Sequence, residues 1–246
     1  MSPGPEPRQD PEALEAEEAK AWERQVLLLE GQGRVTRTFR RLDPARQRAV
    51  VEAIFAEAAE GGPHALQVKA VAHRAGVAVG SLYQYFPGRD GMLDFAVDVT
   101  TGVLTSSFDA CAPAMADLPL REGLAAYLDA GLEWSTANAG LLTFFARVAY
   151  SGEPGYLDRL VTPVATSMRG LLHNLLIGAK TRGELAGDVD VDVTTRLVMA
   201  LTTAVADAWL LPQLNGYYLL YDDEHPPERV YAATVDFVLR AIGASS

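Results

Sequence analysis

One stretch decides the fold of this chain: VKAVAHRAGVAVGSLYQYF, residues 68–86. Two helices that cross over a tight turn need a small residue where their backbones approach, and Ala72 provides it. The turn needs a residue that accepts a positive φ, which Gly76 does without steric cost. Val71, Val77 and Leu82 lie at the spacing that packs the second helix on the first. The stretch therefore predicts a helix-turn-helix.

Helices are also predicted on both sides of this motif. Asp43-Pro44 is a typical helix start, because Asp caps the first turn and Pro fits the first helical position. Runs with the alternating pattern of a strand are absent, so the predicted class is all-α. The expected helices cover residues 11–30, 44–61, 67–74, 78–86, 90–110, 120–135, 141–150, 156–182, 192–211 and 227–242, after a disordered Pro-rich leader over residues 1–9.

The motif resembles that of the TetR family of repressors. Residues 71–86 match most of the family string Ile-Ala-x-x-Ala-Gly-Val-Ser-x-Gly-Thr-Leu-Tyr-x-Tyr/His-Phe, and the resemblance extends over about residues 46–92. It implies a dimeric, all-helical regulator in which a three-helix DNA-binding domain precedes a larger helical domain for ligand binding and dimerisation. The domains expected from it are an N-terminal extension, 1–42, the DNA-binding domain, 43–92, and the ligand-binding and dimerisation domain, 93–246.

The resemblance also implies which residues touch DNA. In the recognition helix, Gln84 can pair with adenine and Val79 can meet a thymine methyl group. Gly80 allows the helix to approach the DNA closely, and Arg89 takes the place of a family Lys at the start of the next helix, where phosphate binds well. The full expected set is Lys69, Ala78, Val79, Gly80, Ser81, Tyr83, Gln84, Tyr85 and Arg89.

Some positions depart from the family pattern. Ala78 replaces a capping Ser that also touches phosphate, which removes an N-cap contribution of about 1 kcal/mol. Residues 66–67 are Leu-Gln in place of Thr-Thr. Tyr83 and Tyr85 have an alternative interpretation as ordinary core aromatics. We favour DNA contacts for both, because apolar neighbours already fill the interior face of so short a helix.

The charge distribution makes DNA binding compatible with a net charge of -11. Residues 1–33 carry -5, whereas residues 34–94 carry nine basic and six acidic groups, so only this second stretch suits a polyanion. A basic connector precedes the first family-like helix. It is either a solvated linker or an arm that contacts flanking DNA, and the arm residues are Arg34, Arg37, Arg40 and Arg41.

The acidic C-terminal part resembles the family only in outline. By that resemblance its last two long helices form a homodimer interface, for which we expect Val198, Leu201, Val205, Val235, Val238 and Leu239 to supply apolar surface. The alternating Asp188, Asp190 and Asp192 are expected to serve helix capping rather than to bind calcium. The residues expected around a small-molecule effector, or else simply in the core, are Trp134, Phe144, Phe145, Arg147, Tyr150, Met168, Leu172, His173 and Trp209.

Other classes of protein find little support. With one cysteine, Cys111, the chain has no intramolecular disulfide, and its four histidines lack metal-ligand spacing. Signal and membrane segments are absent, so we expect a cytoplasmic protein. The sequence contains no motif of a hydrolase, metalloprotease or nucleotide-binding enzyme, and we expect no cofactor or catalytic residue. The alternatives to a ligand-released repressor are a DNA-binding activator or architectural protein without ligand, and, less favoured, a small-molecule enzyme.

Overall fold

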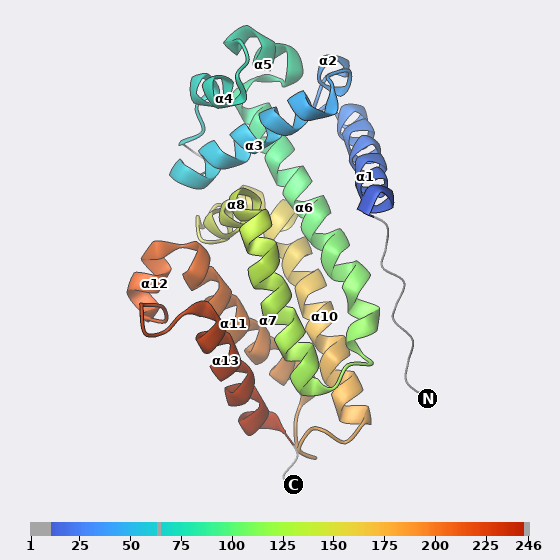
Figure 1. Cartoon of the computed structure of the whole chain (residues 1–246), viewed down its shortest axis with the longest axis vertical. Coiled ribbons are helices and arrows are strands. Elements are labelled where there is room, and N and C mark those ends of the chain that lie inside the picture. The colour runs from blue at the N-terminus through green and yellow to red at the C-terminus, as the bar shows by residue number, and fades with distance from the viewer. Residues whose placement is uncertain (1–10, 63–64, 244–246) are drawn as a thin grey trace. The chain divides into compact units, whose positions relative to one another are not determined.

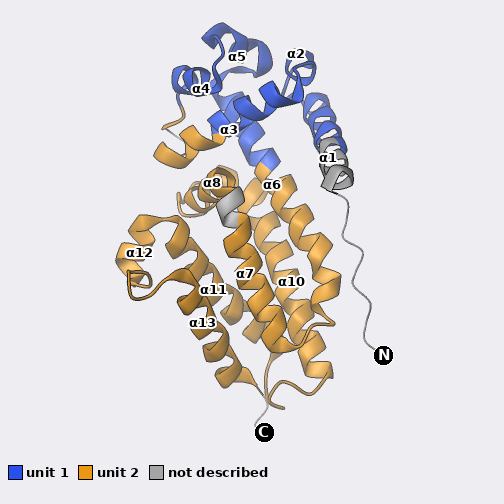
Figure 2. Cartoon of the chain, in the orientation of Figure 1, with its two compact units in different colours: residues 1–54, 67–99 blue, residues 55–66, 100–246 orange. Residues whose placement is uncertain are grey.

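A computed structural model describes residues 11–62 and 65–243. The predicted leader over residues 1–9 lies outside them. Regular structure in the described residues is helical, apart from isolated bridges, which agrees with the predicted all-α class (Figure 1). The chain forms two compact units, one from residues 1–54 and 67–99, the other from residues 55–66 and 100–246 (Figure 2). Among the described helices, none combines the length and apolar character needed to cross a membrane.

The first unit contains the predicted helix-turn-helix. Gly76 ends α4 with φ of +64° and its N–H bonds the carbonyls of Ala72 and His73, as a positive-φ helix end requires. Asp43 Oδ1 accepts the Arg46 N–H at 2.9 Å, which confirms the predicted cap of α3. The elements that contribute to this unit are α1 (Pro11–Gly31), α2 (Arg37–Arg40), α3 (Pro44–Gly61), α4 (Val68–Ala75), α5 (Val79–Tyr85) and the beginning of α6 (Gly88–Met115).

The core of the first unit includes part of the predicted basic connector. Phe39 is fully buried, and its ring packs against those of Tyr85, Phe86 and Phe95. The interpretation of this segment as merely a solvated linker is therefore wrong, because it forms α2 and contributes a core aromatic. The arginines around Phe39 dominate the composition of the segment, so its two buried apolar residues, Val35 and Phe39, are hard to recognise from the sequence.

The second unit is a helical bundle whose core lies between its long helices. Leu124 of α7, Leu172 of α10, Val198 of α11 and Val235 of α13 belong to one buried apolar cluster. Asp190 caps α11 by accepting the N–H groups of residues 192 and 193, as predicted. The bundle also contains α12, which the sequence analysis did not foresee. Its elements after α6 are α7 (Leu120–Ala137), α8 (Ala139–Ala149), α9 (Pro154–Tyr156), a π-helical turn (Leu157–Val161), α10 (Thr162–Thr181), α11 (Val191–Leu210), α12 (Pro212–Tyr218) and α13 (Pro227–Ile242).

The apolar residues expected at a dimer interface divide into two groups. Val198, Val205, Val235 and Val238 are buried inside the second unit, so they cannot form a surface between two copies. The prediction is wrong for these four, because α11 and α13 have apolar residues on more than one face. The exposed large apolar residues of the two helices are instead Val193, Leu197, Trp209 and Phe237, with Leu201 and Leu239 half-buried.

Candidate nucleic-acid interface and effector site

The recognition helix α5 separates a buried face from an exposed one. Leu82 is buried against the rest of the unit, whereas Tyr83 is 58% exposed and Val79 is 36% exposed. Ala78, Gly80 and Gln84 are also exposed, and Ser81 is half-buried. A two-turn helix held by one face in this way presents its other face to a partner, as helix entry into a DNA groove requires.

Tyr85 does not belong to that exposed face. Its side chain is 6% exposed and lies edge-on to Phe39, with the ring centroids 6.1 Å apart. The prediction that Tyr85 reaches a phosphate is therefore corrected: it is a core aromatic. The reason is the connector segment, since Phe39 provides the apolar partner that the isolated helix-turn-helix sequence lacks.

The start of α5 lacks the usual cap. Ala78 adopts extended φ and ψ and, among the described residues, no side chain caps the helix at this position. Gln67 likewise makes no side-chain cap bond at the start of α4. The first N–H groups of both helices therefore remain available for water or for a phosphate oxygen.

Two basic residues complete the predicted DNA face. Lys69 is exposed on α4. Arg89 is half-buried in the first turn of α6, where its Nη1 lies 3.1 Å from Asp90 Oδ1. An approaching phosphate would compete with this exposed carboxylate for the guanidinium group, and pairs of this kind are weak in water.

The fold leaves room for a side chain at Gly80, so a substitution there tests how closely α5 approaches DNA without disturbing the fold. A Cβ added there meets no described atom within 4 Å, so Gly80→Ala is expected to stabilise the fold by about 0.5 kcal/mol. If α5 lies close to DNA, the same methyl group should weaken operator binding by about tenfold, the size of one lost base contact. Urea denaturation and a DNA titration measure the two effects. Gly131→Ala, in another open helical position, is the matched control for stability alone.

The four connector arginines have two different roles. Arg34 lies 3.0 Å from Asp94 and 2.5 Å from Asp98, and Arg40 pairs with Glu30 of α1. These two guanidinium groups hold the connector to its own unit. Arg37 and Arg41 are exposed one helical turn apart. Of the four arginines of the predicted arm, these two have the charges that are most accessible to DNA.

A polar cluster lies between α8 and α11 of the second unit. The Tyr150 hydroxyl donates to Asp207 Oδ2 at 2.9 Å, and Asp207 is only 8% exposed. Burial raises the pKa of the Asp207 carboxyl to about 6, against the opposing effect of the Tyr150 hydrogen bond. Asp207 was not among the site residues predicted from the sequence, although a single acid within the apolar run of residues 197–211 indicates a buried charge.

Two further polar atoms of these helices are buried without a partner. Arg147 Nε and Thr203 Oγ1 find no hydrogen-bond acceptor or donor among the described residues. Arg147 lies one turn before Tyr150 on α8, and Thr203 one turn before Asp207 on α11. An unsatisfied buried donor is costly, and a ligand or ordered water that accepts from it removes the cost.

The other residues predicted around an effector are scattered through the second unit. Phe144 packs on Phe55, and Leu172 belongs to the central core. His173 Nδ1 lies 3.4 Å from Thr195 Oγ1. Trp209 is 45% exposed and packs edge-on to Tyr221. Trp134, Phe145 and Met168 are half-buried.

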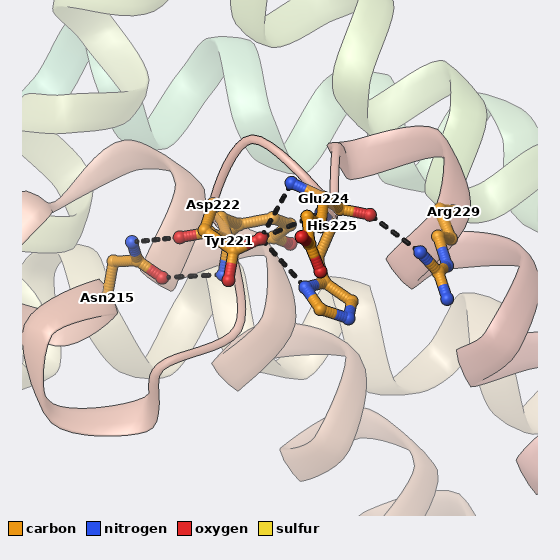
Figure 3. Close-up of polar contacts among 6 residues, drawn as sticks. All are labelled: Asn215, Tyr221, Asp222, Glu224, His225 and Arg229. Atoms are coloured by element: carbon orange, nitrogen blue, oxygen red, sulfur yellow. Dashed lines mark hydrogen bonds and ion pairs between the residues drawn. The ribbon is translucent and has the colours of Figure 1, made fainter.

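An open groove of about 500 Å³ lies on the exposed side of α11 and α13. Its floor is apolar, and one wall is the loop that precedes α13. Hydrogen bonds fix this loop: Asn215 to Tyr221, Asp222 to Glu224 and His225, and Arg229 to the Glu224 carbonyl (Figure 3). The groove is lined by Leu201, Leu219, Leu220, Asp222, His225, Arg229, Val230, Ala233, Thr234 and Phe237.

Comparison with known proteins places this site in context. Residues 50–95 match the family described as bacterial regulatory proteins, tetR family. The repressor KstR of Mycolicibacterium smegmatis is 48% identical over 48 residues, which are 20% of this chain and 24% of that protein. The repressor KstR of Mycobacterium tuberculosis is 26% identical over 190 residues, which cover 66% of this chain and 81% of that protein. The chain thus spans about a quarter of the first relative.

Solved structures share the fold over most of both chains. A TetR family transcriptional regulator from Chloroflexus aurantiacus J-10-FL has a TM-score of 0.61 at 19% identity, covering 85% of this chain and 98% of that one. A complex of SmeT with triclosan has a TM-score of 0.61 at 18% identity, covering 82% and 92%. FadR from Bacillus subtilis with stearoyl-CoA has a TM-score of 0.55 at 18% identity, covering 78% and 95%. Residues 50–95 thus match the tetR family of bacterial regulatory proteins, and the chain shares its all-helical fold with a solved TetR family regulator.

Proposed function

We propose that the chain is a transcriptional repressor that binds a palindromic operator as a homodimer and leaves it when a small hydrophobic or amphipathic effector binds the second unit. The observation that carries the proposal is the exposed face of α5, which holds Val79, Gly80, Tyr83 and Gln84 opposite the buried Leu82. Base contacts from such a face give sequence specificity. A regulator of this kind acts in the cytoplasm, where bacterial DNA lies.

The proposed DNA contacts fall into two classes. Gln84 and Val79 read base edges, with Gly80 allowing close approach. Lys69, Tyr83 and Arg89 contact phosphates, together with the free N–H groups near Ala78, and half-buried Ser81 lies at the edge of this face. Arg37 and Arg41 extend the positive surface toward flanking DNA. Residues 43–92 then form the DNA-binding domain and residues 93–246 the effector and dimer domain.

The polar cluster of the second unit supports an effector. Two relatives in fold were solved with small molecules, one with triclosan and one with stearoyl-CoA. In this chain, Arg147 Nε and Thr203 Oγ1 are buried polar atoms without a described partner, beside the Tyr150–Asp207 pair along α8 and α11. Apolar pockets with few polar groups suit ligands that are largely apolar. We propose Arg147 as the group that orients an oxygen of the effector.

The exposed faces of α11 and α13 support the homodimer. Val193, Leu197 and Leu201 are spaced four residues apart on α11, and Phe237 of α13 is 64% exposed. Large apolar side chains exposed on adjacent helices mark an interaction surface. A second copy related by a twofold axis covers both faces and places the two recognition helices on half-sites about one DNA turn, or a multiple of it, apart.

Operator binding tests the proposal. A DNA duplex selected from a random pool by the full chain serves as the operator, and anisotropy gives its Kd over a range of salt. Tyr83→Ala and Arg89→Ala should both weaken binding, and Arg89→Ala should also reduce the log–log salt slope by about 0.9. Circular dichroism confirms that the variants fold.

The outcomes separate the candidate functions. If both variants bind with the wild-type affinity and slope, the assigned DNA face is wrong. Release of the operator by acyl-CoA or other amphipathic compounds supports a ligand-released repressor. Tight operator binding that no such compound affects favours an activator or architectural protein without ligand.

A further inference from the structure

The N-terminal extension is joined to the far end of the recognition helix. The Thr36 hydroxyl donates to the Gln84 carbonyl at 2.5 Å, and the Thr36 N–H donates to the Tyr85 carbonyl at 2.9 Å. The last carbonyls of a helix have no partner within it. Thr36 therefore satisfies two of the terminal carbonyls of α5 from a position 48 residues earlier in the chain.

The surrounding contacts make this junction rigid. Phe39 is fully buried among the aromatic rings that follow α5, and Arg34 pairs with Asp94 and Asp98 of α6. Thr36 itself caps α2, because its hydroxyl accepts the Phe39 N–H. The segment thus contacts both the end of α5 and the beginning of α6.

Other residues of the extension also pack on the first unit. Trp22 Nε1 donates to Gln47 Oε1 at 2.8 Å, and the other side of the Gln47 amide donates to the carbonyls of Phe39 and Arg40. Val26 and Leu29 of α1 are buried. None of this segment lies within the family match, which begins at residue 50.

We propose that Arg34, Thr36 and Phe39 form a clamp that sets the position of the recognition helix, with Thr36 as the positioning residue for base reading by Gln84. Thr36 holds the backbone carbonyl of the same residue whose exposed side chain is proposed to read the operator. A helix end that can shift loses the geometry of a bidentate base contact, whereas phosphate contacts tolerate a shift. This inference rests on the proposed function.

The test compares specific and non-specific binding. Thr36→Val removes the hydroxyl at nearly constant shape and constant charge, and with it both the bond to the Gln84 carbonyl and the cap of α2, so operator affinity should fall about five- to tenfold. Binding to a scrambled duplex and the salt slope should not change. Thr36→Ser restores the hydroxyl and should bind the operator within about twofold of wild type. Thr166→Val, which removes a hydroxyl bonded within its own helix, is the control.

Each outcome decides the matter. Loss of operator preference in Thr36→Val with rescue by Thr36→Ser supports the clamp. The clamp is overturned if Thr36→Val binds the operator with wild-type affinity, or if it loses affinity equally for operator and scrambled DNA. In either case the proposed function still stands, provided that the wild-type chain binds the operator more tightly than scrambled DNA. A wild-type chain that selects no sequence from the random pool overturns both.

Discussion

Replacing Leu197 or Phe237 with glutamate is expected to produce monomers and to weaken operator binding by about 100-fold or more, since two linked DNA-binding modules gain that much from effective concentration. Both side chains are exposed, on α11 and α13 respectively, and neither is needed for the core of its own unit. A buried glutamate without a partner at the centre of the interface is strongly unfavourable. Light scattering at micromolar concentration and anisotropy with the palindrome measure the two effects.

The control for this experiment is Ile177→Glu. Ile177 is 45% exposed on α10, a helix that contributes no residue to the proposed interface, so the new charge should leave both mass and affinity unchanged. Dimers in Leu197→Glu and Phe237→Glu, or monomers that bind the palindrome as tightly as wild type, would show that this face does not assemble the DNA-binding species. A half-site duplex should bind the monomeric variants and the wild type about equally.

The helix-turn-helix could be predicted from sequence because its determinants are local. Gly76 provides the positive φ, Ala72 and Leu82 provide the contact between helices, and all three lie within eleven residues. The predicted cap at Asp43 rests on contacts three residues apart. The residues that stabilise such short-range features are close together in the sequence, so these features can be predicted without knowing the rest of the fold.

The clamp could not be predicted because its partners are distant in sequence. Thr36 and Gln84 are 48 residues apart, and Arg34 and Asp98 are 64 residues apart. In the sequence, Thr36 is one hydroxyl residue within a basic stretch, which reads as a solvated connector. The wrong prediction for Tyr85 has the same cause, because its packing partner Phe39 lies in the segment that was interpreted as a connector.

The faces of the C-terminal helices could not be assigned for a different reason. Val198 and Leu197 are adjacent and equally apolar, yet the first is buried and the second is 65% exposed. Helical periodicity identifies an apolar face when the other faces are polar. α11 has apolar residues around most of its circumference, so only packing against its neighbours distinguishes the core face from the exposed one.

Asp207→Asn is expected to stabilise the chain at pH 7, because the carboxyl is buried and its pKa is raised to about 6. The unfolded carboxyl has a pKa near 3.8. Between these two values the folded state binds more protons than the unfolded state, so stability falls as pH rises through this window and stays low above it. At pH 7 the raised pKa of Asp207 lowers the free energy of unfolding of the wild type by up to about 3 kcal/mol.

Urea denaturation at several pH values between about 4.5 and 7.5 measures this effect. The advantage of Asp207→Asn over wild type should be small at the acidic end, where Asp207 is protonated and resembles Asn, and should grow to its full size at pH 7. Asp109→Asn, at an exposed position of α6, should show no such trend. A pH-independent difference for Asp207→Asn would mean that the buried carboxyl titrates normally.

The cost of Asp207 at neutral pH bears on the effector. Among the described residues, Tyr150 is the one side chain shown donating a hydrogen bond to the Asp207 carboxylate, which leaves acceptor capacity of that carboxylate unused. Replacing the carboxylate is therefore expected to stabilise the folded chain. If Asp207→Asn gains stability but loses the response to an effector that still releases wild type from the operator, the carboxylate serves ligand recognition. If the response is unchanged, the effector contacts lie elsewhere, and Arg147→Gln becomes the deciding variant for the polar end of the site.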